Sequence, residues 1–404
     1  MKPTLGWTLL SRDSLRRAEA RLNDEFQGVR DEIGFLTLHQ AYADRFFPGT
    51  SVLQTRLRYA LFVPWIYDKI ASHHISGRVE ELILQEEIHL TGRLKKSKEE
   101  GIIGDRTYPR PTVQPPSMIY WTALGVWGIL RPFPDASLPS RSTVHRTLQY
   151  RGPRNQLLDD DKQPLQGERT YFVALPKPPK EWDDLKQPLN FKIHRDEAIF
   201  LRKHLIGVTR PGTTNIPSLL SRLVELRVPM AGVKFPWHPS ILRVADSEER
   251  KALMRAKQLA ALSAIGRGVY AALVEQLSQD DGISQIEDLH RQNLKAVIHK
   301  NSKAAEKLDI GAVKSDAPTV PPLILEILEA TQQWLRDGKT SLKDLYPLYS
   351  QAEMKRKNQR ARLASTLAGR QKRIEWEPSK HPKAEPLHYR WPRVQQLLSD
   401  LESK

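Results

Sequence analysis

The chain has 404 residues, of which 39% are hydrophobic, and this is enough apolar material to build folded domains and to exclude disorder as its main state. Its 63 lysines and arginines exceed its 47 aspartates and glutamates, and the resulting net charge of +16 favours an anionic partner, with nucleic acid first. The absence of cysteine excludes disulfides, thiolate metal sites and cysteine nucleophiles, and it fits a reducing compartment.

The chain shows no pattern of a membrane or export segment. No apolar run reaches the roughly 18 residues that a membrane span requires. The N-terminus, MKPTLGWTLLSRDSLRR, lacks the charged, apolar and small-residue zones of a signal peptide. We therefore predict a cytoplasmic protein with no membrane partner.

The first half of the chain has the apolar spacing of several helices, preceded by a short extended segment at its start. Ser51 and Gln54 match a capping box, which we expect to begin the third of these helices. Pro64 removes a backbone donor from that helix, so we expect a kink there or an end near Val63. The predicted helices span residues 15–26, 36–46, 57–70, 77–100 and 118–130.

Residues 151–190 are rich in proline, aspartate and lysine and contain one strand-like run, 170–175, so we expect a connection between two parts of the chain. Beyond it the signals are helical, and the helix at 247–278 is long enough for a central scaffold. The other predicted helices in this part span 196–206, 218–226, 286–299 and 323–337.

The sequence therefore predicts a mainly α, multi-helical fold with a few short strands and a long central helix in the C-terminal half. We divide the chain into four parts. They are an N-terminal helical domain at 1–150, the connection at 151–190, a helical domain with the long helix at 191–340, and a basic C-terminal helical region at 341–404.

A run of basic residues near the C-terminus is the strongest electrostatic feature. Eight cations lie in nineteen residues with no acidic residue between them, and Gly369 is placed to end the helix that carries the first five. Such a run favours contact with nucleic-acid phosphates, whereas the alternative is a solvated helix face. The predicted contact residues are Lys355, Arg356, Lys357, Arg360, Arg362, Arg370, Lys372 and Arg373.

A second candidate is the segment 139–148, PSRSTVHRTL, which resembles the recognition half of a helix-turn-helix. Arg141 and Arg146 would then contact nucleic acid. The residues before it, 131–137, make the turn longer than that motif allows. The alternative is an ordinary capped helix with both arginines exposed.

A third candidate is a weak anion site after the turn at Pro48 and Gly49. Thr50 and Ser51 would offer a helix N-terminus, and Arg56 and Arg58 follow about a turn later. Simple capping explains the two hydroxyl residues, and it is the interpretation we favour. Because both arginines lie on an apolar helix, we expect at least one buried carboxylate partner, with Asp44 or Asp68 as the candidates.

No complete catalytic constellation is present, so we predict no catalytic residue, no metal site and no cofactor. A His-Glu-x-x-His zinc signature, a phosphate-binding loop and a nucleophile elbow are all missing. A nuclease core could only be placed on Asp344, Glu353 and Lys355, in a segment that has helical rather than strand patterning. The aromatic and basic residues at 376–393 could stack on bases, but we favour their packing a C-terminal helix at 393–401 onto the body.

Four sequence blocks resemble an uncharacterised bacterial domain-of-unknown-function family, number 6361. The blocks are LGW at 5–7, FPGTSVLQTRLRYALFVPWIY at 47–67, IYWTALGVWGI at 119–129 and LHYRWPRVQQLLSDL at 387–401. The resemblance supplies no activity and no catalytic residue. It implies a role by association only, because members of the family tend to lie near helicases, nucleases and other genes of phage-defence islands.

These observations lead to one hypothesis and two alternatives. The hypothesis is a non-enzymatic, nucleic-acid-binding accessory subunit of an anti-phage defence system, with DNA favoured. The first alternative is a structural adaptor that docks a helicase or nuclease partner. The second is an unrecognised nuclease. Residues 351–404 carry 13 basic and 6 acidic side chains, so we expect nucleic-acid contact in this C-terminal arm.

Overall fold

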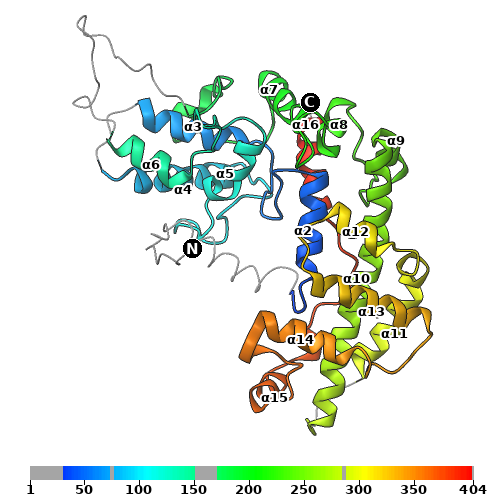
Figure 1. The fold of residues 1–404 in the computed structure, drawn as a ribbon. Helices are drawn as coiled ribbons and strands as arrows, with labels where there is room; N and C mark the ends of the chain where they lie inside the picture. The colour runs from blue at the N-terminus through cyan, green and yellow to red at the C-terminus, as the bar shows by residue number, and fades with distance from the viewer. Residues whose placement is uncertain (1–30, 73–76, 151–170, 284–287, 403–404) are drawn as a thin grey trace, which may run out of the picture. The chain divides into compact units, whose positions relative to one another are not determined.

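The computed structural model describes residues 31–72, 77–150, 171–283 and 288–402 (Figure 1). These residues are mainly helical, which confirms the predicted fold class. Two isolated antiparallel bridges, Leu130 with Phe172 and Thr209 with Pro217, are the only β pairing in this part of the chain. No helix within it is long and apolar enough to cross a membrane. The predicted helix at 15–26 and the extended segment before it lie outside the described residues.

Backbone contacts divide the described residues into two compact units, which we call unit 1 and unit 2. Unit 1 contains residues 47–231 and 392–402, and unit 2 contains residues 31–46 and 232–391. Each unit is therefore assembled from segments that are distant in sequence. The four predicted parts follow the chain continuously, and that division stays a prediction.

Unit 1 is built on buried helices at the positions that the apolar spacing predicts. The central one, α3, buries ten of its fourteen residues and packs against α4 and α5. The α-helices of this unit are α3 (Tyr59–Ser72), α4 (Val79–Lys96), α5 (Pro116–Val126), α6 (Arg141–Tyr150), α7 (Arg195–Ile206), α8 (Leu219–Glu225) and α16 (Trp391–Glu402). A short 3-10 helix, η2 (Lys180–Asp183), precedes α7.

The predicted end of α3 near Val63 and its predicted start at the capping box are wrong, whereas the alternative of a kink at Pro64 stays a prediction. The helix does not end at Pro64 but continues to Ser72, because Val63, Trp65 and their neighbours are buried and hold the segment in place. The side chain of Gln54 accepts a hydrogen bond from the Ser51 amide at 3.1 Å, as in a capping box. This bond closes a turn, however, and the helix begins only at Tyr59.

Unit 2 is organised around α10 (Ser247–Asp280), the long scaffold helix that the sequence predicts. Asp246 caps its start by accepting a hydrogen bond from the Glu249 amide at 2.8 Å. The helices α2, α11, α13 and α15 pack against it. The other helices of this unit are α2 (Phe35–Phe46), α9 (Pro239–Val244), α11 (Leu289–Ala305), α12 (Ile310–Asp316), α13 (Pro322–Arg336), α14 (Tyr346–Lys357), η3 (Asn358–Arg360), α15 (Leu367–Ile374) and η4 (Pro378–Lys380).

A glycine of α10 lets α2 approach closely. A Cβ atom at Gly266 would lie 2.6 Å from Cε2 of Phe35, which is closer than real Cβ contacts allow. The side chain of Phe35 therefore occupies the space that any larger residue at this position would fill. The contact fixes the start of α2 against the scaffold.

Gly369 does not end the helix that carries the first five residues of the basic run. That helix, α14, ends at Lys357, and Asn358 follows it with a positive φ of 48°. Gly369 lies instead in the first turn of α15, where its amide donates to the Thr366 hydroxyl at 3.1 Å. A Cβ atom at Gly369 would lie 2.2 Å from the carbonyl oxygen of Ala364, so the turn before α15 requires glycine.

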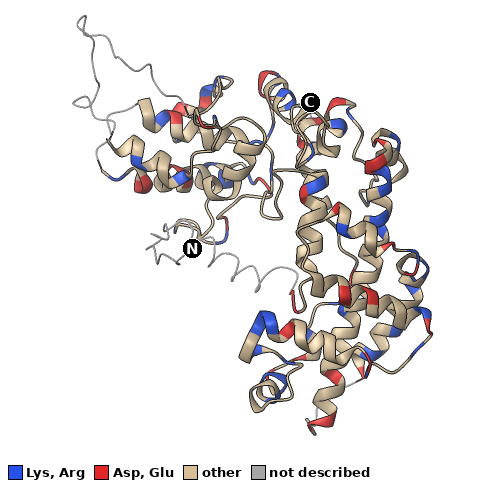
Figure 2. Ribbon diagram, in the orientation of Figure 1, with Lys and Arg blue, Asp and Glu red and all other residues tan. Residues whose placement is uncertain are grey.

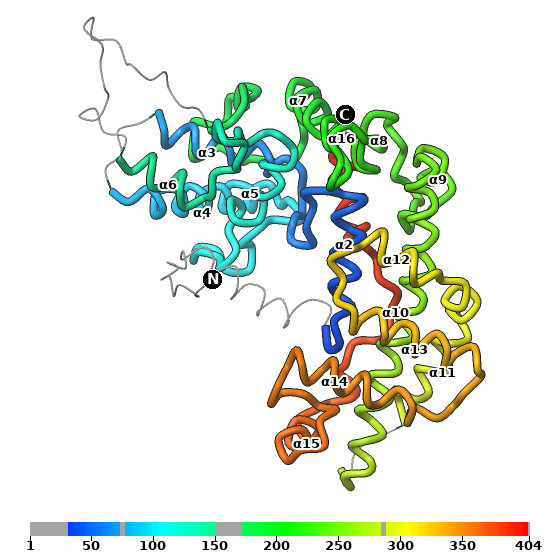
Figure 3. Tube along the Cα trace, in the orientation of Figure 1, coloured from blue at the N-terminus to red at the C-terminus, as the bar shows by residue number. Residues whose placement is uncertain are grey.

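After η4 an extended segment, residues 381–388, runs beside α10. We call it the strap, and its colour in Figure 3 is orange-red. Tyr389 and Arg390 end it with positive φ values of 49° and 62°, and the Tyr389 hydroxyl donates to the carbonyl oxygen of Ala256 at 2.9 Å. Trp376, Tyr389 and Trp391 are buried. The aromatic residues of this region therefore pack the core, as the favoured prediction expects.

Candidate functional site

Most of the basic run is paired with carboxylates in unit 2. Arg356 contacts Asp31 at 2.6 Å, and both Lys357 and Arg362 contact Glu32, at 3.4 and 3.6 Å. These two acidic residues precede α2, more than 300 residues away in sequence. The composition of the run alone cannot reveal this neutralisation, because the balancing charges come from the other end of the chain.

Two further residues of the run are also paired. Arg373 is only 3% exposed, and its guanidinium contacts Asp281 at 2.6 Å and donates to the carbonyl oxygens of Arg362 and Ala364. Lys372 contacts Glu375, one helical turn later, at 2.6 Å. The guanidinium donors of Arg373 are therefore used by acceptors within the protein, and they hold α15 against the residues around it.

Three of the exposed residues of the run contact no carboxylate in the described part of the chain. Lys355 and Arg360 form no ion pair with any described residue. Arg370 donates to the carbonyl oxygen of Asp281 at 3.3 Å and contacts no carboxylate in the described part of the chain. These three residues, at the end of α14, in η3 and in α15, are the ones that the structure leaves available to an external phosphate. Figure 2 colours the basic positions of α14 and α15 blue.

The helix predicted at 139–148 exists as α6, but its two arginines differ. Arg141 is buried and donates to the Ser117 hydroxyl at 3.0 Å, so the expectation that it is exposed is wrong. It lies on the same face as Val144 and Leu148, which pack the core. Arg146 is exposed. Residues 127–140 separate α5 from α6, a longer connection than a helix-turn-helix has.

The predicted anion site near residues 50–58 has its donors committed within unit 1. Thr50 is buried, and its hydroxyl donates to the carbonyl oxygen of Phe47 at 2.7 Å. Arg58, 1% exposed, donates twice to Glu197, at 2.9 and 2.7 Å, and Arg56 contacts Asp400 at 3.0 Å.

Buried carboxylate partners are thus confirmed for both arginines, but they are not the predicted ones. Asp44 contacts Arg390 instead. Asp68 is exposed at the surface of α3. The partners Glu197 and Asp400 lie in the distant helices α7 and α16, which no local spacing could identify.

The residues considered for a nuclease core have internal or unrelated contacts. Glu353 is buried, and its two oxygens accept hydrogen bonds from the Tyr270 hydroxyl at 2.6 Å and the Leu363 amide at 2.8 Å. Asp344 contacts Lys339 at 3.1 Å. Across the described residues, no group of three or more histidine, aspartate or glutamate side chains could hold a metal ion.

The exposed face of α11 is a basic surface that was not predicted from the sequence. The helix carries four cationic residues and no acidic one, and it packs through Leu294 and Ala305. Lys295, Lys300 and Lys303 are exposed, and in the described part of the chain none of them has an ion-pair partner. At 100° per residue they lie within an arc of about 140°. The lack of acidic residues over 289–305 was the signal that could have identified this face.

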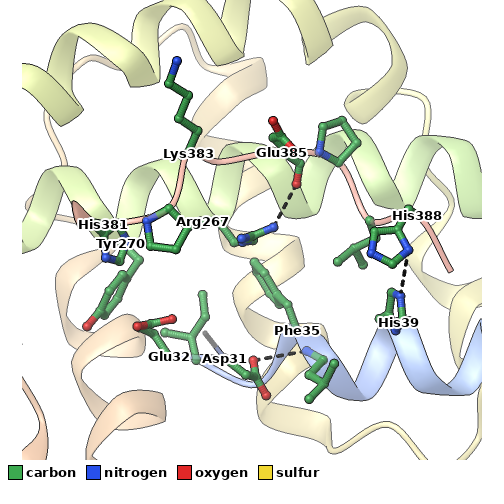
Figure 4. Close-up of a pocket in the computed structure, with 15 residues that line it drawn as sticks. Asp31, Glu32, Phe35, His39, Arg267, Tyr270, His381, Lys383, Glu385 and His388 are labelled. Carbon is green, nitrogen blue, oxygen red and sulfur yellow. Dashed lines mark hydrogen bonds between the residues drawn. The ribbon is translucent and has the colours of Figure 1, made fainter. Parts of the chain in front are cut away.

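Unit 2 also contains a cavity of about 420 Å³, lined by α2, α10, the strap and the residues just before α2 (Figure 4). Its aromatic walls come from Phe35 and Tyr270, with histidines from α2 and the strap. Arg267 of α10 points toward the strap, where its Nη1 donates to the carbonyl oxygen of Glu385 at 3.0 Å. Burial lowers the pKa of Arg267, and nearby carboxylates of Glu32 and Asp31 oppose that shift.

Two histidines at the edge of this cavity share one backbone donor. The Arg390 amide lies 3.2 Å from Nε2 of His39 and 3.1 Å from Nδ1 of His388. The two ring nitrogens themselves lie 3.5 Å apart, and which of them donates depends on the tautomer (Figure 4). Burial lowers the pKa of His39 to about 3, so this ring is neutral at physiological pH.

A comparison with protein families matches residues 3–278 to a family described as "Family of unknown function (DUF6361)". Three of the four resembling sequence blocks lie within the matched residues, and the block at 387–401 lies beyond them. No curated protein and no solved structure matches the chain. The matched range contains α2 and nearly all of α10, whereas α11, the basic run and the strap follow it.

Proposed function

We propose that this member of the DUF6361 family is a nucleic-acid-binding protein with its contact surface in unit 2. The function of the family is unknown, so membership itself supplies no activity. The exposed lysines of α11 are the main contact, and the exposed residues of the basic run add to it. The residues of this surface are Lys295, Lys300, Lys303, Lys355, Arg360 and Arg370.

The observation that carries the proposal is the charge of α11. An acidic residue three or four positions from a lysine on a helix surface pairs with it and reduces its attraction for phosphates. The lysines of α11 have none within the helix, and they are exposed. A surface of this kind binds the nucleic-acid backbone by releasing counterions, with little dependence on sequence.

The proposed role includes no catalytic step. Binding of the phosphate backbone without chemistry suits an accessory subunit, which brings nucleic acid to an enzyme. The association of related genes with phage-defence islands, implied by the resemblance, makes a helicase or nuclease the partner to look for. DNA duplex is the first substrate to test.

The test measures the salt dependence of binding by fluorescence anisotropy of a labelled DNA duplex. The triple variant K295E/K300E/K303E should weaken binding about tenfold or more and reduce the slope of log K against log salt by about 2–3, since each lost phosphate contact contributes about 0.9. A wild-type affinity that is already negligible at about 50 mM salt would contradict the proposal.

The matched control changes the same amount of charge elsewhere. Lys177, Lys192 and Lys203 are exposed residues of unit 1. The variant K177E/K192E/K203E should keep the wild-type salt slope. If both triple variants reduce the slope equally, the effect comes from net charge and the assignment to α11 fails.

The adaptor alternative is favoured by exposed apolar residues on the helices that carry the basic run. Leu367 is 88% exposed at the start of α15, and Ile374 and Met354 are also exposed. Large apolar side chains exposed in this way indicate a protein partner. Co-purification after nuclease treatment separates the two functions: an adaptor retains its partner, whereas an association through DNA is lost.

A further inference from the structure

The cavity of unit 2 holds a cation without a carboxylate partner. Arg267 forms no ion pair with any described residue, and its one hydrogen bond within that part of the chain is to the carbonyl oxygen of Glu385. A half-buried guanidinium loses hydration, so a partner of opposite charge would stabilise it. The remaining donors of its planar fork suit a carboxylate or a phosphate.

Two of the three acidic residues that line the cavity in the described part of the chain, Asp31 and Glu32, are paired with other cations. Asp31 accepts hydrogen bonds from the amides of Gly34 and Leu36, at 2.9 and 3.1 Å, and contacts Arg356 at 2.6 Å. Glu32 lies between Lys357 and Arg362. The carboxylates of Glu32, Asp31 and Glu385 act electrostatically on Arg267, but none of them forms an ion pair with it. The pairing of Asp31 and Glu32 with other cations reduces the repulsion that an entering anion would meet.

The walls around Arg267 are aromatic. Phe35 lies on one side of the guanidinium in Figure 4, and Tyr270 and His381 lie near the far end of the cavity, with their ring centroids 6.2 Å apart. Flat aromatic walls favour a planar ring, which packs against them with a large contact area. The volume, about 420 Å³, is within the range of pockets that bind small molecules.

We propose that this cavity binds a small organic anion of about mononucleotide size, with its phosphate or carboxylate on Arg267 and a planar ring against Phe35 and Tyr270. The site is independent of the basic surface that the proposed function uses. The same chemistry is offered by nucleoside monophosphates and by aromatic carboxylic acids, and the experiment distinguishes these two sources.

Isothermal titration calorimetry with the full-length chain tests the proposal. The probes are the four ribonucleoside monophosphates, indole-3-carboxylate, adenosine and inorganic phosphate. We expect one of the first two classes to bind and to define the source of the ligand. Adenosine and inorganic phosphate should bind at least tenfold more weakly, because each lacks one of the two features. Failure of all ring-bearing anions to bind, or equal binding of inorganic phosphate, would overturn the proposal.

Variants locate the binding. Arg267→Gln keeps a donor for the strap but removes the charge, and it should weaken binding at least tenfold, whereas Arg267→Lys should retain more of it. Arg243→Gln, a matched change at an exposed position of unit 2 outside the cavity and the basic surface, should leave binding unchanged. Thermal unfolding of each variant verifies that it is folded. Undiminished binding by a folded Arg267→Gln protein would contradict the site.

A last variant separates this inference from the proposed function. A mononucleotide could also contact the lysines of α11, so K295E/K300E/K303E is titrated with the same probe. We expect it to bind the probe with wild-type affinity. A loss of probe binding in this variant would place the ligand on the basic surface and overturn the cavity proposal, whatever the result with DNA.

Discussion

Glu87 of α4 is a buried acid without a cationic partner at contact distance among the described residues. Its Oε1 accepts a hydrogen bond from the Ser117 amide at 2.6 Å, and its Oε2 has no hydrogen-bond partner in the described part of the chain. Burial raises the pKa of this carboxyl to about 7, against an ordinary value of 4.5. Between these two pH values the carboxyl of Glu87 is therefore protonated in the folded protein and ionised in the unfolded chain.

The stability of the protein should consequently fall as pH rises from about 4.5 to about 7, because ionisation of Glu87 then opposes folding. Glu87→Gln removes this ionisation, since an amide oxygen can still accept from Ser117. At pH 8 the variant should be more stable than the wild type by about 1–3 kcal/mol, and the difference should vanish at acidic pH.

Urea unfolding at several pH values measures this difference. Glu225→Gln, at an exposed position of unit 1, is the control and should follow the wild-type curve. If the free energy of unfolding of Glu87→Gln differs from that of the wild type by the same amount at every pH, the carboxyl is already ionised in the folded state.

At the scale of single residues, the sequence predicts that a buried arginine requires a carboxylate partner, but it does not identify that partner. The apolar surroundings of Arg56 and Arg58 correctly require buried carboxylates. Their actual partners, Asp400 and Glu197, are separated from them by 344 and 139 residues. Local spacing contains no information about which distant carboxylate contacts these arginines in the folded protein, so both suggested partners were wrong.

At the scale of elements, the packing of α2 on α10 depends on the absence of a side chain at Gly266. Adding a methyl group there should destabilise unit 2 by about 1–3 kcal/mol, because Phe35 would have to move within a packed core. Gly311→Ala is a suitable comparison, since the nearest atom to its Cβ, Oδ1 of Asp309, would be 3.4 Å away. Thermal unfolding should show a lower midpoint for Gly266→Ala only.

Equal midpoints for the two variants would mean that α2 shifts without cost.

The positions of the helices were largely predictable, because apolar spacing and capping act over a few residues. The long helix at 247–278 and the helix at 323–337 match α10 and α13 closely. The basic surface of α11 was not predicted, because its cations are less dense in sequence than those of the basic run, and only folding decides which cations stay unpaired.

At the scale of the whole molecule, the exposed positive charge is set by the fold and not by the composition alone. Asp31 and Glu32 contact three cations of the basic run, so the run presents less positive charge than its composition suggests. The double variant D31N/E32Q should release this charge and steepen the salt slope of DNA binding by about 1–3. The amide oxygen that the first of these changes introduces can still accept the backbone amides that Asp31 accepts, which helps to preserve the local turn.

The comparison variant is D337N/D344N, which changes the net charge equally and alters the contacts of Lys339 and Gln333, outside the basic run. Anisotropy titrations of both proteins measure the slopes. If the two double variants steepen the slope equally, the residues of the basic run are not part of the nucleic-acid surface, and the binding belongs to α11 alone.

Both units are completed by segments made late in synthesis. In unit 1, Arg56 cannot form its ion pair until Asp400, 344 residues later, has been made. In unit 2, Asp31 cannot form its ion pair until Arg356, 325 residues later, has been made. At about 5–20 residues per second, these partners emerge from the ribosome roughly 15–70 s after the residues that they contact. Neither unit can therefore reach its final form before these later segments have been made. A chain that stops early leaves the apolar surface of α10 without the segments that cover it last, which makes the chain a substrate for chaperones and proteases.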